Sequence, residues 1–172
     1  RSEPASTGGI LACFAHPDDE TFGSGGTLAR CAAQGIPVSL VCATRGEAGE
    51  ISDPTLATAE TLAQVREEEL RCACRALGIG GLYLLGYRDS GMAGSEDNRH
   101  PEALAAAPLA QVTGRLVKIF RDLKPEDVIT FDPIGGYRHP DHIAIHKATV
   151  EAFHAAGDPK QFPEAGAPFQ SF

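Results

Sequence analysis

The chain has 172 residues and carries 15 Lys and Arg against 23 Asp and Glu, so its formal net charge is −8. Nucleic acids and anionic membrane surfaces attract clustered basic side chains, so this balance argues against both as partners. The length suits one domain with an ordinary core, and a hydrophobic content of 42% excludes disordered and fibrous classes.

Short apolar runs alternate with helical patterns along the first half of the chain. The apolar runs predict buried strands over residues 10–15, 37–43 and 81–85. Helical spacing predicts helices over residues 24–34 and 58–77. Gly35 and Gly78 stand where glycine commonly ends a helix, which supports both boundaries.

The second half begins with a loop over residues 86–107 that contains Gly, Asp and Pro. An amphipathic stripe then predicts a helix, and its apolar positions are Leu109, Val112, Leu116, Ile119, Phe120 and Leu123. Lys124 and Pro125 end that helix, because the residue before a proline is disfavoured in the helical conformation. A fourth strand over residues 127–131 and a last helix over 141–156 complete the pattern.

Strand and helix alternate four times, and this order predicts parallel strands joined by crossover helices. The strands show no alternation of polar residues, as expected when helices cover both faces of a sheet. The pattern therefore predicts an α/β sandwich.

The helix predicted over residues 58–77 carries charge on its apolar side. That side consists of Leu62, Val65, Cys72, Ala73 and Ala76. At about 100° per residue, Glu69 falls in the middle of this side and Arg66 falls at its edge. A buried carboxylate needs a partner, so we expect Glu69 to pair with a basic or hydrogen-bonding group in the interior. A tilted helix would instead bring both side chains to solvent.

Titratable residues follow each predicted strand, where ligands bind in open α/β sheets. The four loops contain the sequences AHPDDE, TRGEAGE, GYRDSGM and DPIGGYRHPDH. Two of these loops contain a His-Pro-Asp motif, at His16 and at His139. This density of histidine at matching strand ends predicts a functional site rather than solvated turns.

The loop after the first strand does not suit a dinucleotide. A dinucleotide site would have a glycine-rich phosphate loop at this place, but residues 16–20 contain one histidine and three carboxylates. The carboxylates would repel a phosphate unless a cation intervened. Together with the H-x-x-H of residues 139–142, they supply neutral nitrogen and anionic oxygen donors. Such a set predicts a divalent metal site with positions left open for water and substrate.

These motifs carry a resemblance. AHPDDE after the first strand and HPDH after the fourth resemble the LmbE/PIG-L family of metal-dependent deacetylases. GYRDSGM and GGYRHPDH are similar in particular to the bacterial branch that acts in the mycothiol pathway. The resemblance runs over about residues 10–150 and implies a Rossmann-like three-layer sandwich with a mainly parallel sheet. It also implies a hydrolase that removes an acetyl or acyl group from an N-acetylglucosamine-type sugar or glycoconjugate.

The family's pattern assigns the metal and the base. His16, Asp19 and His142 correspond to the ligands of one Zn²⁺ per chain, with other divalent metals such as Fe²⁺ admitted. Asp18 corresponds to the general base that takes a proton from a metal-activated water. The residues alone leave open which of Asp18 and Asp19 is the ligand.

The resemblance also implies further catalytic roles. His139 corresponds to the histidine that meets the developing negative charge, and Tyr137 matches a tyrosine used in the mycothiol branch. Asp141 is placed to orient an imidazole.

Candidates for substrate binding are Arg66, Asp89, Arg45 and Glu47. The first two match positions that the family links to the substrate, whereas the last two are open between substrate contacts and loop structure. We expect a small-molecule amino sugar as the substrate.

Two other functions fit part of the pattern. A non-haem Fe(II) oxygenase uses a similar set of two histidines and one carboxylate, although its usual scaffold is all-β. A sugar-binding module without activity would need neither Asp18 nor His139, so the intact acid–base set favours the hydrolase.

The five cysteines are an odd number without a zinc-box spacing, so we expect reduced thiols, with Cys13 and Cys42 in the core. No apolar stretch approaches the roughly 18–20 residues that would span a bilayer. The expected reduced thiols indicate a cytoplasmic protein. Residues 1–172 are expected to form a single LmbE-like domain with its core over about 10–156 and a short or truncated C-terminal part. Whether the chain forms a homo-oligomer is not readable from its sequence.

Overall fold

The computed structural model describes residues 7–170. Its strands are β1 (Ile10–Phe14), β2 (Val38–Cys42), β3 (Gly81–Leu84) and β4 (Asp127–Ile129). Its α-helices are α1 (Asp19–Phe22), α2 (Gly25–Ala33), α3 (Leu62–Leu77), α4 (Leu109–Leu123), α5 (Gly135–Arg138) and α6 (Pro140–Ala155). Short 3₁₀ helices cover Glu96–Arg99, Leu104–Ala106 and Pro163–Ala165.

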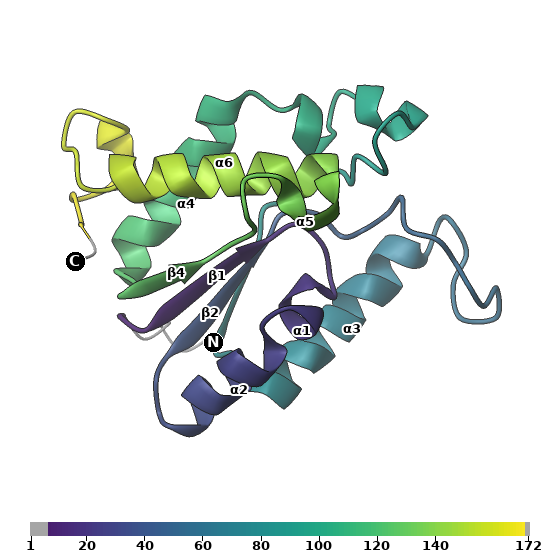
Figure 1. The fold of residues 1–172 in the computed structure, drawn as a ribbon, viewed down its shortest axis with the longest axis horizontal. Helices are drawn as coiled ribbons and strands as arrows, with labels where there is room; N and C mark the ends of the chain where they lie inside the picture. Colours follow the sequence, from purple (N-terminus) through teal and green to yellow (C-terminus); the bar gives the residue numbers. More distant parts are fainter. Residues whose placement is uncertain (1–6, 171–172) are drawn as a thin grey trace.

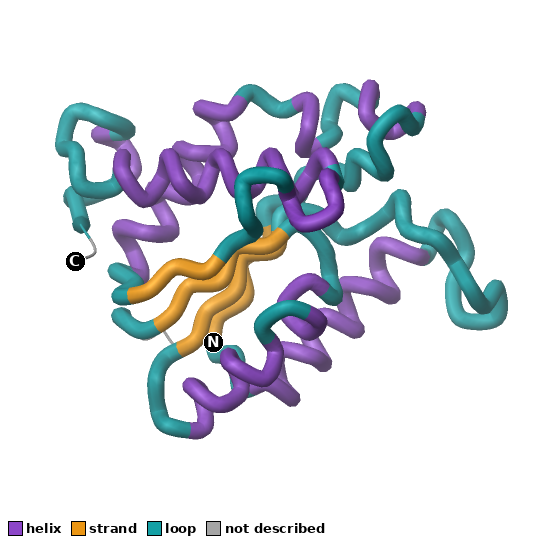
Figure 2. Tube along the Cα trace, in the orientation of Figure 1, coloured by secondary structure: helices purple, strands orange, loops and turns teal. Residues whose placement is uncertain are grey.

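The four strands form one parallel sheet in the order β3-β2-β1-β4. Ile10 of β1 pairs with Val38 of β2 on one side and with Asp127 of β4 on the other. The chain thus winds outward from β1 to β3 and then crosses back to place β4 beside β1. Helices lie on both faces of this sheet (Figures 1 and 2), which confirms the predicted Rossmann-like α/β sandwich.

Each face of the sheet has its own apolar core. Helices α4 and α6 cover one face, and α2 and α3 cover the other (Figure 1). Side chains of β1 alternate between the two: Leu11 and Cys13 join the core under α4 and α6, while Ile10, Ala12 and Phe14 join the core over α2 and α3. Burying a large aliphatic or aromatic side chain contributes about 1.5–3 kcal/mol, so both cores hold the central strand in place.

Some element boundaries differ from the predicted ones. Helix α3 begins at Leu62 rather than at residue 58, because the chain turns before it, with the Thr61 hydroxyl accepting a hydrogen bond from Thr58 N at 2.8 Å. Strand β4 ends at Ile129 rather than at residue 131. There the Thr130 hydroxyl donates to the Cys13 carbonyl at 2.9 Å.

The prediction for Glu69 is wrong, because its side chain is exposed. The buried positions of α3 are Leu62, Leu70 and Cys74, which form a narrower stripe than expected. The prediction counted Cys72 and Ala76 in the apolar side, yet both are exposed. Small side chains remove little apolar area from water, so they do not determine which face of a helix packs.

All five cysteines have free thiols, and Cys13 and Cys42 are buried in the core as predicted. Burial raises the pKa of the Cys13 thiol to about 12, so this group stays neutral. Across residues 7–170, no helix is long and apolar enough to cross a membrane.

Candidate metal centre

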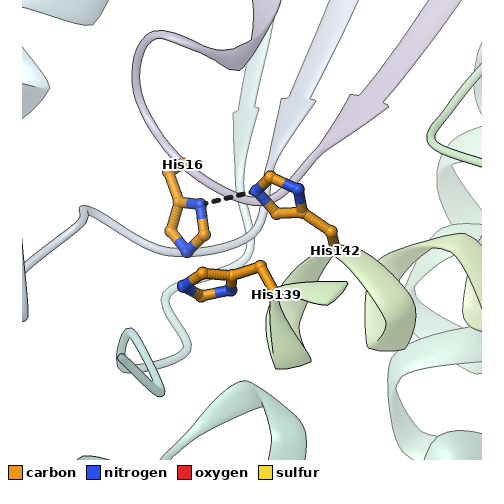
Figure 3. A group of neighbouring side chains, drawn as sticks. All are labelled: His16, His139 and His142. Atoms are coloured by element: carbon orange, nitrogen blue, oxygen red, sulfur yellow. Dashed lines mark hydrogen bonds between the residues drawn. The ribbon is translucent and has the colours of Figure 1, made fainter. Parts of the chain in front are cut away.

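The direction of winding reverses between β1 and β4. In open α/β sheets, ligands bind at the carboxyl ends of the strands at such a point. His16 and Asp19 follow β1, while His139 and His142 lie at the start of α6, after β4. Figure 3 shows the imidazoles of His16, His139 and His142 gathered together. Their ligand nitrogens all lie within 4.8 Å of one another.

The three predicted metal ligands converge. His16 Nδ1 lies 3.2 Å from His142 Nε2 and 3.5 Å from Asp19 Oδ2. His142 Nε2 lies 3.4 Å from Asp19 Oδ1. Ligand atoms at about 2.0–2.2 Å from a tetrahedral zinc ion lie roughly 3.3–3.6 Å from each other. The spacing and chemistry of these donors therefore fit a zinc-sized cation.

Neighbouring groups hold these donors in place. Asp19 Oδ2 accepts hydrogen bonds from His16 N at 2.7 Å and from Ala15 N at 3.2 Å. The Phe131 ring stacks on the His142 imidazole, with centroids 3.8 Å apart and planes 8° from parallel. Both contacts restrict rotation of a donor side chain, so the site is organised by the protein itself.

The other nitrogen of His16 faces two buried carboxylates. His16 Nε2 lies 3.1 Å from Asp141 Oδ2 and 3.4 Å from Asp89 Oδ1. Asp89 also accepts hydrogen bonds from Ala48 N at 3.2 Å and from Gly91 N at 2.8 Å. A carboxylate that accepts from Nε2–H leaves Nδ1 free to bind a metal, which is the usual arrangement at metal-bound histidines.

Burial and charge give the two histidines opposite properties. Burial lowers the pKa of His142 to about 4, so its imidazole is neutral at physiological pH. Burial also acts to lower the pKa of His16, but hydrogen bonds to Asp141 and the other carboxylates raise it well above its ordinary value. The surroundings of His16 thus favour positive charge, which a metal cation can supply in place of a proton.

His139 caps the N-terminus of α6. Its Nδ1 accepts a hydrogen bond from Asp141 N at 3.2 Å. The proton of the neutral imidazole therefore sits on Nε2, which points away from the helix (Figure 3). Burial and the positive charge of His16 lower the pKa of His139, which favours this neutral form.

Asp18 has a strained backbone, with φ 109° and ψ −31°. Non-glycine residues rarely adopt such values, and those that do cluster at functional sites. Glu20, which is buried, accepts a hydrogen bond from Asp18 N at 3.0 Å, and Arg66 donates to Asp18 Oδ2 at 2.9 Å. Burial raises the pKa of Asp18 despite the opposing charge of Arg66.

A cavity of about 280 Å³ opens over this cluster. The predicted site residues that line it are His16, Asp18, Arg66, Asp89, Tyr137 and His139. Tyr137 is 63% exposed, and its ring meets the His142 imidazole edge-on at 5.1 Å between centroids. The cavity thus brings the predicted ligand His16 together with the predicted base and the predicted oxyanion contacts.

Two predicted substrate contacts, Arg45 and Glu47, are not part of the cavity wall. Glu47 Oε2 accepts a hydrogen bond from Asp89 N at 3.2 Å. Arg45 is exposed and lies 3.8 Å from Glu67 and 3.9 Å from Glu47. These contacts favour loop structure, the alternative that the sequence left open for this pair.

Sequence reasoning missed two residues that support the cluster. Phe131 stacks on His142, and Ser90 is fully buried against Asp141. Ser90 stands within the GYRDSGM run, whose polar character marked the loop as functional. No spacing rule connects a residue of that loop to the start of α6, so its contact was not predictable.

Comparison with known proteins gives a consistent picture. A family model described as "PIG-L: GlcNAc-PI de-N-acetylase" matches residues 11–153. The "1D-myo-inositol 2-acetamido-2-deoxy-alpha-D-glucopyranoside deacetylase" of Streptomyces avermitilis is 43% identical over 94% of this chain and 58% of its own length. The enzyme of the same name from Acidothermus cellulolyticus is 47% identical over 83% of this chain and 52% of its own length. The chain therefore spans little more than half the length of these relatives.

Solved structures resemble the fold as well. An N,N'-diacetylchitobiose deacetylase from Pyrococcus horikoshii matches with a TM-score of 0.77 and 30% identity, over 94% of this chain and 57% of that one. A 4-carboxy-2-hydroxymuconate hydratase from Pseudomonas putida matches with a TM-score of 0.69 and 24% identity, over 94% and 63%. The second likeness shows the fold alone, so function has to be argued from the site.

Proposed function

Since the chain belongs to the PIG-L (GlcNAc-PI de-N-acetylase) family, we propose that it hydrolyses the acetamido group of an N-acetylglucosamine-type sugar at a zinc centre. The products are acetate and the free amino sugar. The deacetylases named above support this class of substrate, because each is named for an acetamido sugar or an acetylated amino sugar.

One observation carries the proposal. The donor atoms of His16, Asp19 and His142 lie 3.2–3.5 Å from one another. Of these three residues His16 lines the cavity, together with Asp18 and His139. Amide hydrolysis at a metal requires metal ligands, a base and a hydrogen-bond donor, and the proximity of these residues supports giving them those roles.

In this proposal His16, Asp19 and His142 hold the cation. A divalent cation bound there would lower the pKa of its water toward about 7 and would polarise an amide carbonyl. Asp18 takes the proton from the attacking water and returns it to the amine as the C–N bond breaks. Burial raises the pKa of Asp18, which makes its carboxylate a stronger base than an ordinary aspartate. Arg66 holds one oxygen of Asp18 and leaves the other for this transfer.

His139 faces the negative charge that develops on the amide oxygen. Its Nδ1 is occupied by Asp141 N, so its Nε2–H is the group that donates toward the oxyanion. We assign Tyr137, at the rim of the cavity, as a second donor that meets the substrate from the open side. Both assignments use hydrogen bonding by neutral groups and need no change of charge on the protein.

The fold described for residues 7–170 gives no support to an Fe(II) oxygenase, which we associated with an all-β scaffold. The parallel sheet covered by helices on both faces is the scaffold of the deacetylase structure described above. Iron remains an admissible metal for the hydrolase, because histidine nitrogen and carboxylate oxygen also bind Fe²⁺.

The test is release of amine and acetate from a panel of N-acetylated sugars by protein loaded with zinc or with iron. We expect release to stop on chelation and to return when metal is added back. The variant Asp18→Asn should lose most activity, while Asp122→Asn, an exposed carboxylate on α4, should keep it. If neither metal form releases amine from any sugar in the panel, the proposed activity is wrong.

A further inference from the structure

Ser90 has no role in the reaction described above, yet it is fully buried beside the metal centre. Its hydroxyl is hydrogen-bonded to Asp141 Oδ1, and its N–H donates to Asp141 Oδ2 at 2.9 Å. Asp141 is itself completely buried. Two hydrogen bonds from one residue thus fix both oxygens of this carboxylate.

The directions of these hydrogen bonds follow from a backbone group. Ala105 N, which can only donate, bonds to Ser90 Oγ at 2.9 Å. The Ser90 hydroxyl accepts this bond and donates its own proton to Asp141 Oδ1. Asp141 thus accepts one hydrogen bond from Ser90 on each of its two oxygens.

The hydrogen bonds that run from Ala105 through Ser90 to Asp141 continue to the proposed metal centre. Asp141 Oδ2 lies 3.1 Å from His16 Nε2, so a proton on Nε2 has a carboxylate oxygen as its acceptor. The lone pair of His16 then lies on Nδ1, the nitrogen that faces Asp19 and His142. A chain of hydrogen bonds thus runs from Ala105 N through Ser90 and Asp141 to His16.

We propose that Ser90 is a positioning residue that acts through Asp141 to hold His16 in the tautomer that binds the metal. The inference rests on the metal centre proposed above, but not on the identity of the sugar. It also links the loop after β3, whose Gly91 and Met92 line the cavity, to the first ligand of the cation.

The first test measures zinc affinity by competition with a chromophoric chelator. Groups behind a metal ligand typically change affinity by about 10–100-fold, and we expect Ser90→Ala to weaken binding about tenfold. Ser95→Ala is the matched control, because the Ser95 hydroxyl bonds to the Ser90 carbonyl at 3.2 Å within the same loop. We expect that control to bind zinc as the wild type does.

The second test separates action through Asp141 from a general effect on the loop. In an Asp141→Asn background, Ser90→Ala should cause no further loss of zinc affinity. A tenfold loss that persists in this background would overturn the proposal, and so would wild-type affinity in the single variant. If Ser90→Ala does not fold, Ser90→Cys keeps the size of the side chain with a weaker donor, and it should show a smaller loss that also vanishes in the Asp141→Asn background.

Failure of this inference is distinguishable from failure of the proposed activity. Zinc affinities that follow the expected pattern without release of amine would support the role of Ser90 and refute the deacetylase. Amine release together with a zinc affinity that Ser90→Ala leaves unchanged would support the deacetylase and refute the role of Ser90. Absence of zinc binding by the wild type would overturn the proposal for Ser90.

Discussion

Replacing Asp18 with glycine and with alanine separates its chemical role from the energy of its backbone conformation. A non-glycine residue at φ 109° costs about 1–3 kcal/mol, and glycine relieves this strain. Glycine loses about 0.5–1 kcal/mol more than alanine through the entropy of the unfolded chain. Both variants lose the ion pair with Arg66, so that contribution cancels. We therefore expect Asp18→Gly to be more stable than Asp18→Ala by about 0.5–2 kcal/mol, the reverse of the usual order.

The two variants should share one functional result. General acid–base catalysis contributes about 10²–10⁴-fold, so turnover of both should fall by that factor. Zinc affinity should stay near that of the wild type, because Asp18 is not among the proposed ligands. Urea unfolding of the metal-free proteins gives the stability difference, and amine release gives the turnover. An alanine variant at least as stable as the glycine variant would show that the backbone is not strained, and unchanged turnover would remove Asp18 as the base.

Three further predictions concern other parts of the structure. His142→Ala should weaken zinc binding at least about 100-fold in a chelator competition, since it removes one of three protein ligands; full occupancy at low zinc would contradict the ligand assignment. Glu20→Gln should keep zinc but lower kcat roughly tenfold, because a neutral amide is a weaker acceptor for Asp18 N, and an unchanged kcat would show that Glu20 does not position the base. The Arg121 guanidinium lies within 3.3 Å of six backbone carbonyls between residues 155 and 166, which share its five N–H donors. Arg121→Met should therefore lower the free energy of unfolding by about 3–6 kcal/mol, and a loss below about 1 kcal/mol in urea would refute this account.

The strands and the layer order were predictable because they depend on apolar runs that only a doubly covered sheet can bury. Leu11 and Ala12 are both fully buried on opposite faces of β1, as an unbroken apolar run requires. The packing face of α3 was not predictable to the same precision. Helical period gives the direction of each side chain but not the width of the neighbouring surface, and Glu69 lies just beyond that surface.

The gathering of His16 and His142 at one end of the sheet was predictable, because the loops after parallel strands lie at the same edge. Their direct contact depends on β4 lying beside β1, a strand order that the sequence pattern does not give. The contacts of Ser90 and Phe131 depend instead on the path of irregular segments. Ser90 belongs to the loop between β3 and α4, where neither a period of two nor one of 3.6 applies. Its position follows from individual hydrogen bonds, such as the one from Ala105, that a linear pattern does not reveal.

The meeting of His16 and His142 also joins the ends of the fold. These residues are 126 positions apart, so a cation held by both would act as a reversible crosslink between the loop after β1 and helix α6. The donors do not converge in an unfolded chain, so binding stabilises the folded state, by about 2.7 kcal/mol at a free metal concentration 100 times Kd. Detachment of α6 alone would open the crosslink and release the ion. Zinc release should therefore coincide with the loss of α6 packing, so that a zinc-sensitive dye reports the unfolding of this helix.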